Sequence, residues 1–233
     1  PYLRELTDVV ASYDDRIMIF EDYPDGNYGT QEQYLGFYGV NPDVSMPFNF
    51  EGLSAKFSAE SFSTMVNEFQ GMINPDIHTP VYCFSNHDQA RIATRYGGTE
   101  QARLVALMQL TLPGLPVVYY GDEIGMMNAP IRFDEIQDKS VFSHGNDESV
   151  GRDPERTPMQ WTGEKNAGFS QAKPWLPVDP ISKKVNVNVE QHDPDSFFAL
   201  YQRLLKLRSR YEILRLGEYE TIGDAGDDIF AYA

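Results

Sequence analysis

Apolar residues recur along the chain at two different spacings. Residues 3–13 place them three and four positions apart, which predicts a helix. Ile17–Phe20 form a short continuous apolar run, which is typical of a strand buried on both faces. The same patterns predict further strands at Val44–Phe50, Val81–Phe84 and Leu115–Tyr120, and further helices at Ser58–Ile73, Thr99–Leu112 and Ser196–Tyr211.

Two stretches show neither spacing. Tyr23–Pro42 is rich in glycine and tyrosine, and we expect a loop there. From about Asn128 to Pro194 glycine, proline, aspartate and asparagine dominate, which predicts a long loop insert with short helical turns. A loop of that length inside a folded domain is usually functional.

The order of these elements predicts an α/β fold. Strands that alternate with helices form right-handed βαβ units and a mainly parallel sheet. In such folds the polar residues that follow the strands meet at one edge, where the chemistry takes place. The residues directly after each predicted strand are therefore the first candidates for a functional site.

Charge and composition narrow the class of partner. The 233 residues include 35 acidic and 19 basic ones, so the formal net charge is −16. This excess disfavours nucleic acid and anionic membrane surfaces and fits a neutral substrate. No run approaches the roughly 18 apolar residues of a membrane span. The single cysteine, Cys83, lies in an apolar run, which predicts a buried and inert thiol.

Carboxylates follow three of the predicted strands. They are Glu21-Asp22, Asp88 in the segment Asn86–Gln89, and Asp122-Glu123. Two converging carboxyl groups would flank a glycosidic bond, one protonating the leaving oxygen and the other stabilising positive charge on the sugar. For Glu21 or Asp88 alone a helix cap or a loop ion pair is the favoured interpretation, so the combination carries the hypothesis.

Metal chemistry has little support in the sequence. The four histidines show no zinc-like spacing, and we expect no catalytic transition metal and no required cofactor. Acidic loop residues leave a structural calcium ion open, with a merely solvated acidic loop as the alternative. These residues are Asp134, Asp138, Asp147 and Glu148.

Several segments are recognisable together. Cys83–Arg91 resembles the fourth conserved region of the α-amylase superfamily of glycoside hydrolases, family thirteen. Leu112–Met126 is similar to the eighth strand region of that family, and Ile19–Glu21 stands where its fifth strand presents the general acid/base. Within the family, Gly151–Trp161 with Asn166–Ser170 resembles the α-glucosidase, oligo-1,6-glucosidase and trehalose-synthase branch, and Met46–Phe50 also fits that branch.

The resemblance implies a role for five residues. Glu21 would be the acid/base, and Asp88 the third carboxylate that orients sugar hydroxyls and supports the distorted transition state. His87 would donate a hydrogen bond to the sugar at the cleavage site. Arg152 would close the pocket around that sugar, and Arg91 would face the neighbouring sugar site. Asp22 departs from the small or apolar residue expected there, and its charge would raise the pKa of Glu21.

The resemblance also implies an architecture. Residues 1–216 would form the second half, about strands five to eight, of a (β/α)8 TIM barrel, with the insert at about 128–194. Residues 217–233 would begin an all-β C-terminal domain. The family's nucleophilic aspartate belongs to the fourth strand, which precedes this region, so we expect the chain alone to lack the attacking group and to be nearly inactive. Its open half-barrel would favour self-association unless the missing N-terminal half is supplied.

The implied function is a retaining α-glucosidase that hydrolyses terminal α-linked glucose from oligosaccharides. A transglycosidase or isomerase such as trehalose synthase or sucrose isomerase stays open, as does a non-catalytic amylase-like binding subunit. The sequence leaves α-1,4 against α-1,6 preference undecided. One cysteine and no visible export signal favour the cytoplasm, with secretion open because the start of the parent protein is expected to be missing.

Overall fold

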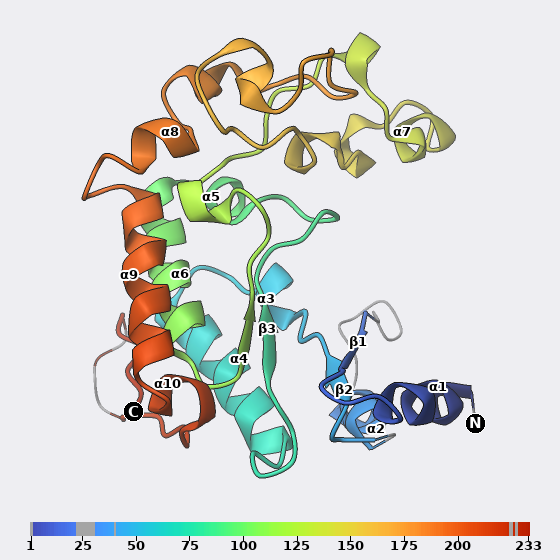
Figure 1. Cartoon of the computed structure of the whole chain (residues 1–233), viewed down its shortest axis with the longest axis vertical. Helices are drawn as coiled ribbons and strands as arrows, with labels where there is room; N and C mark the ends of the chain where they lie inside the picture. Colours follow the sequence, from blue (N-terminus) through green and yellow to red (C-terminus); the bar gives the residue numbers. More distant parts are fainter. Residues whose placement is uncertain (1, 22–30, 40, 224–225, 227) are drawn as a thin grey trace. The chain divides into compact units, whose positions relative to one another are not determined.

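The computed structural model describes residues 2–21, 31–39, 41–223, 226 and 228–233 (Figure 1). The chain forms two compact units. Unit 1 comprises Pro1–Phe84, Thr111–Val117 and Tyr211–Ala233, and unit 2 comprises Ser85–Leu110 and Val118–Arg210. The chain therefore passes from one unit to the other four times.

Unit 1 is built on four short parallel strands. They are β1 (Met18–Phe20), β2 (Ser45–Pro47), β3 (Val81–Cys83) and β4 (Leu115–Val117). β1 pairs with β2 and β3 with β4, and a parallel bridge between Asn49 and Tyr82 joins the two pairs. The predicted parallel strands are confirmed, although each is shorter than its apolar run.

The helices of unit 1 are α1 (Tyr2–Ala11), α2 (Gln31–Tyr38), α3 (Glu51–Ser54), α4 (Ala59–Met72) and α10 (Ile213–Leu216). Helix α4 begins as predicted, because the Ser58 side chain accepts a hydrogen bond from the backbone N–H of Ser61. Its apolar face packs on β3, where the Phe69 ring meets Tyr82 edge to face at 5.7 Å. Cys83 is buried as expected, in a cluster with Phe50 and Leu53.

Two predictions for unit 1 were wrong. The stretch predicted as a loop before Pro42 contains helix α2, which is held by its tyrosines: the Tyr38 hydroxyl donates to the Thr79 carbonyl at 2.8 Å. Strand β1 was expected to be buried on both faces, yet Ile17 and Ile19 are 50% and 47% exposed. Within the described residues only the Phe20 side of this strand is covered.

Unit 2 consists of helices and turns. Its α-helices are α5 (Ile92–Arg95), most of α6 (Thr99–Thr111), α7 (Lys139–Ser143), α8 (Val187–Glu190) and α9 (Phe197–Arg210). Figure 1 shows α6 and α9 running side by side, and Arg208 of α9 donates to the Leu110 carbonyl at 3.1 Å. A core of Ile124, Met126 and Met159 lies in the same unit. The helices predicted at Thr99–Leu112 and Ser196–Tyr211 are confirmed as α6 and α9.

The insert is ordered without apolar periodicity. As predicted, it contains short helical turns, and side chains cap them: Asp138, Asp179 and Asn186 each accept a hydrogen bond from a backbone N–H two or three residues later. The turns are α7, α8 and the 3₁₀ segments Phe133–Glu135, Glu148–Val150, Asp153–Glu155, Lys165–Gly168 and Pro180–Lys183. Local capping thus replaces helix periodicity as the source of order.

The described residues of the C-terminal tail include an antiparallel pairing. Thr221 and Tyr232 form a bridge, and the backbones of Glu220 and Ala233 exchange two hydrogen bonds. Its membership of a separate all-β domain stays a prediction. Among the described residues, no helix has the length and apolar character needed to cross a bilayer.

Candidate active site

Glu21 lies directly after β1 in unit 1. The preceding residue, Phe20, is fixed by the sheet, because its carbonyl accepts the Phe48 N–H at 3.0 Å. The Glu21 side chain is exposed. Glu21 is therefore open to solvent at the C-terminal end of the strand, the end at which parallel folds carry their chemistry. Asp22, whose charge was predicted to act on Glu21, lies outside the described residues.

Asp88 of unit 2 is the centre of a polar cluster. Its Oδ1 atom accepts hydrogen bonds from Arg152 Nη1 at 2.9 Å and from Arg156 Nη2 at 2.6 Å. The ring nitrogen Nε2 of His87 lies 3.6 Å from the same oxygen, and the His87 carbonyl accepts from Arg156 Nε at 2.7 Å. Three of the predicted site residues, Asp88, His87 and Arg152, are thus brought together.

Arg152 is held by a second carboxylate, Asp138. The Oδ2 atom of Asp138 accepts both the side-chain Nε of Arg152 at 2.8 Å and its backbone N–H at 3.1 Å. The hydrogen bonds from Arg152 hold the pKa of Asp138 far below its usual range, although its burial acts in the opposite direction. Arg152 therefore stands between two carboxylates, one buried and one partly open to solvent.

A 3₁₀ turn sets the spacing of the two arginines. Arg152 and Arg156 flank Asp153–Glu155, so both guanidinium groups reach Asp88. The turn is anchored by Asp153, which is buried and whose Oδ2 atom accepts the backbone N–H of Asp138 at 2.9 Å. The same residue therefore fixes the turn and the carboxylate that orients Arg152.

Arg91 is fully buried. Its Nη1 donates to the Tyr120 carbonyl at 2.6 Å, its Nη2 donates to the Glu155 carbonyl at 2.8 Å, and its guanidinium group lies over the Tyr119 and Tyr120 rings. The resemblance implied that it faces a sugar. In this structure its donors tie the Tyr120 segment to the turn that carries the site arginines, and its place beside a sugar stays a prediction.

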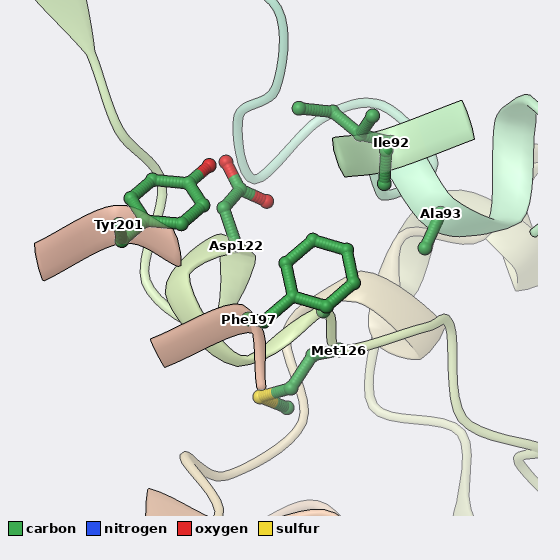
Figure 2. Close-up of a pocket in the computed structure, with 8 residues that line it drawn as sticks. Ile92, Ala93, Asp122, Met126, Phe197 and Tyr201 are labelled. Atoms are coloured by element: carbon green, nitrogen blue, oxygen red, sulfur yellow. The ribbon is translucent and has the colours of Figure 1, made fainter. Parts of the chain in front are cut away.

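Asp122 lies beside this network and is buried too. It accepts hydrogen bonds from the Ser85 hydroxyl and from the Tyr119 N–H, and burial raises its pKa to about 6. Figure 2 shows its carboxyl group facing the Tyr201 hydroxyl beside a cavity of about 10 Å³. This space holds at most about one water molecule, so it is no substrate site.

Two members of the cluster, Arg156 and Asp138, were not predicted as site residues from the sequence. Arg156 belongs to the segment Gly151–Trp161 that carried the family resemblance, and its spacing of four residues from Arg152 was the available signal. Asp138 was considered only as a calcium ligand or a solvated acidic residue. Its role depends on contacts with residues 14 and 15 positions later, which no local pattern indicates.

Comparison with known proteins identifies the family. The family model described as alpha amylase, catalytic domain, matches residues 1–217. Maltase 1 of Drosophila virilis is 38% identical over 88% of the chain, and the probable oligo-1,6-glucosidase 2 of Bacillus subtilis is 30% identical over 99%. The crystal structure of the alpha-glucosyl transfer enzyme XgtA superposes on the whole chain with a TM-score of 0.86 at 26% identity.

The chain is shorter than these proteins. It spans 33% of the Drosophila maltase, 46% of the Bacillus glucosidase and 43% of XgtA.

Proposed function

Because the chain belongs to the alpha-amylase catalytic-domain family, we propose that it forms part of a retaining α-glucosidase that removes terminal α-linked glucose from oligosaccharides. The observation that carries this proposal is the Asp88 carboxylate with two arginines and His87 gathered around one of its oxygens. Maltases and oligo-1,6-glucosidases among its relatives support the same substrate class.

The arginines decide which role suits Asp88. Two guanidinium groups on Oδ1 disperse the negative charge that a nucleophile needs. The same contacts fix the carboxylate in one orientation, which suits a residue that accepts hydrogen bonds from sugar hydroxyls through its other oxygen. We therefore assign Asp88 to orienting the sugar rather than to attacking it. His87 would donate to a hydroxyl of that sugar.

In the proposed reaction Glu21 gives its proton to the glycosidic oxygen as that bond breaks. A carboxylate from outside this chain attacks the anomeric carbon and forms a glycosyl ester. Glu21 then takes a proton from water, which attacks the ester and releases glucose with retained configuration. The chain would supply the second half of the barrel, and the remainder of the protein the nucleophile.

The test is glucose release from maltose, isomaltose and p-nitrophenyl α-glucoside by the whole protein, by its Glu21→Gln variant and by the 233-residue chain. We expect Glu21→Gln to lower kcat by about a hundredfold or more and the chain alone to be inactive. Glu68→Gln, at an exposed carboxylate of helix α4, is the matched control and should match the wild type. Full activity in Glu21→Gln would refute the assigned acid/base.

Glucosyl transfer is the second candidate, because the XgtA structure superposes on the entire chain. Hydrolysis and transfer share the glycosyl intermediate and differ in the acceptor. Product analysis separates them: free glucose indicates water as acceptor, and new oligosaccharides or an isomerised disaccharide indicate a sugar. A protein that binds sugars without consuming any of them would be the non-catalytic subunit instead.

A further inference from the structure

The Glu155 side chain is buried, and the proposed reaction gives it no role. It is 3% exposed and lies at the end of the 3₁₀ turn Asp153–Glu155, which separates the two site arginines. Removing a carboxyl group from water costs free energy unless its oxygens find hydrogen-bond donors. The donors around Glu155 therefore indicate what this residue does.

Three donors from other parts of unit 2 converge on Glu155. Its backbone carbonyl accepts Arg91 Nη2 at 2.8 Å and the Tyr119 hydroxyl at 3.3 Å. Its side-chain Oε2 accepts Nδ2 of Asn128 at 3.0 Å. The turn that carries the site arginines is thus attached to the rest of the unit through this residue.

The amide of Asn128 is fixed in its orientation. Its Oδ1 accepts the backbone N–H of Arg91 at 2.8 Å, and its own backbone N–H donates to Thr94 Oγ1 at 2.7 Å. With Oδ1 turned toward an N–H donor, the NH₂ group of the amide faces Glu155. A carboxyl oxygen accepts this hydrogen bond whether the acid is ionised or neutral.

The segment 87–91 is attached to the turn at both of its ends. At one end Arg156 donates to Asp88 Oδ1 at 2.6 Å and to the carbonyl of the preceding residue at 2.7 Å. At the other end Arg91 meets Glu155 directly and also through the amide described above. Because Arg156 follows Glu155 in the chain, the second attachment determines where the first begins.

We propose that Glu155 is a positioning residue for the site, whose hydrogen bond with Asn128 keeps the turn where Arg156 can fix Asp88. Because Glu155 is buried, it acts through Arg156 rather than on the sugar. The inference rests on the proposed function. It adds to that function a residue that determines how the sugar-orienting carboxylate is held.

The charge of Glu155 gives the proposal a second signature. Burial raises the pKa of Glu155 to about 7, against the opposing effects of Arg156, of Arg91 and of the hydrogen bond from Asn128. The group is therefore mostly neutral at about pH 6 and mostly ionised at about pH 8. Once ionised, it competes with Asp88 for the guanidinium group of Arg156.

The test compares two substitutions of Glu155 in the whole protein, with p-nitrophenyl α-glucoside as substrate. At about pH 6, Glu155→Ala should lower kcat/KM about tenfold, whereas Glu155→Gln keeps an acceptor oxygen for Asn128 and should stay within about twofold of the wild type. Between about pH 6 and about pH 8, kcat/KM of the wild type should fall severalfold more than that of Glu155→Gln, because only the wild type gains a charge beside Arg156.

The matched control is Asn186→Ala, which removes buried hydrogen bonds elsewhere in the insert. The Asn186 side chain accepts the Val189 N–H at 2.9 Å and donates to the Ser182 carbonyl at 2.7 Å. Its loss should lower the urea midpoint as Glu155→Ala does and leave kcat/KM unchanged. Wild-type kcat/KM in Glu155→Ala, an equal loss in Glu155→Gln, or parallel pH profiles for Glu155→Gln and the wild type would overturn the inference.

An NMR measurement separates this inference from the proposed function. Arg156 Nε donates to the His87 carbonyl, so the ring signal of His87, identified by its loss in His87→Gln, reports on the position of Arg156. In the whole protein Glu155→Ala should shift this signal, and Glu155→Gln and Asn186→Ala should leave it in place. If the wild type cleaves no α-glucoside, the proposed function fails, and a shifted signal still supports the positioning role. If the wild type is active and Glu155→Ala leaves the signal unmoved, only the positioning role fails.

Discussion

Replacing Asp122 by asparagine will remove part of the pH dependence of folding. Asp122 is 6% exposed, and its carboxyl group accepts hydrogen bonds from the Ser85 hydroxyl and the Tyr119 N–H. Asparagine has nearly the same shape and keeps one acceptor oxygen. Asp122→Asn therefore abolishes the titration at this position with little change in packing.

The expected magnitude follows from the pKa. Burial raises the pKa of Asp122 from the ordinary 3.8 to about 6. Between these values the folded protein keeps the proton while the unfolded chain releases it, so the free energy of unfolding falls as pH rises. A difference of about two pH units at 1.36 kcal/mol each corresponds to about 3 kcal/mol. This stabilising contribution of Asp122 is complete below about pH 4 and is lost above about pH 6.

Urea unfolding of both proteins at about pH 4 and about pH 7 measures this difference. From about pH 4 to about pH 7 the free energy of unfolding of the wild type should fall by about 3 kcal/mol more than that of Asp122→Asn. Burial also raises the pKa of Glu155 to about 7, but this group titrates in both proteins. Its contribution therefore cancels when the two pH dependences are subtracted. Asp195→Asn, at an exposed carboxylate of the same unit, should follow the wild type. Parallel pH curves for wild type and Asp122→Asn would refute the reasoning.

Three further substitutions test other parts of the structure. Gly121→Ala should lower the free energy of unfolding in urea by about 3 kcal/mol, because the φ of Gly121 is +92° and the new methyl group would lie 2.5 Å from the sulfur of Met126. The control Gly97→Ala, at a φ of +78° with open space around it, should lower it by about 1 kcal/mol. Ser58→Ala should lower the stability of the chain by about 1 kcal/mol through loss of the α4 cap, and an unchanged denaturation midpoint would contradict this. Asp138→Asn should cost about 2 kcal/mol at neutral pH and progressively less as the pH falls below about 4, because a lowered pKa makes the contribution of this carboxylate decline from the unfolded pKa downward. An equal cost at neutral and at acid pH would argue against the ion pair with Arg152.

The sequence predicted helices best where apolar residues recur at a regular spacing along one face. The α4 helix carries both a cap and a regular apolar stripe, and the structure confirms its start at Ser58 and its end before Asn74. Helix α2 escaped prediction because Gly36 interrupts its middle and glycine weakens a helix. What stabilises it is tertiary: Tyr34 and Tyr38 are buried, and the Tyr38 hydroxyl bonds to a carbonyl 41 residues away.

The site was predicted only as far as the motifs extend. Asp88, His87 and Arg152 come together in the structure, and the motif containing Arg152 also contained Arg156. The environment of Arg91 could not be predicted, because its partners are carbonyls 29 and 64 residues further along. Burial of a charge depends on such long-range acceptors, which residue type alone does not indicate.

The division of the chain between the two units sets an order for folding during synthesis. Unit 1 needs residues from Tyr211 onward, whereas the last residue of unit 2 is Arg210. A ribosome therefore synthesises every residue of unit 2 before it begins the segment of unit 1 that starts at Tyr211. The Asp88 cluster, which lies entirely within unit 2, can form while the closing tail of unit 1 is still in the exit tunnel. The two carboxylates assigned to the proposed reaction, Glu21 and Asp88, thus belong to units that are completed at different times.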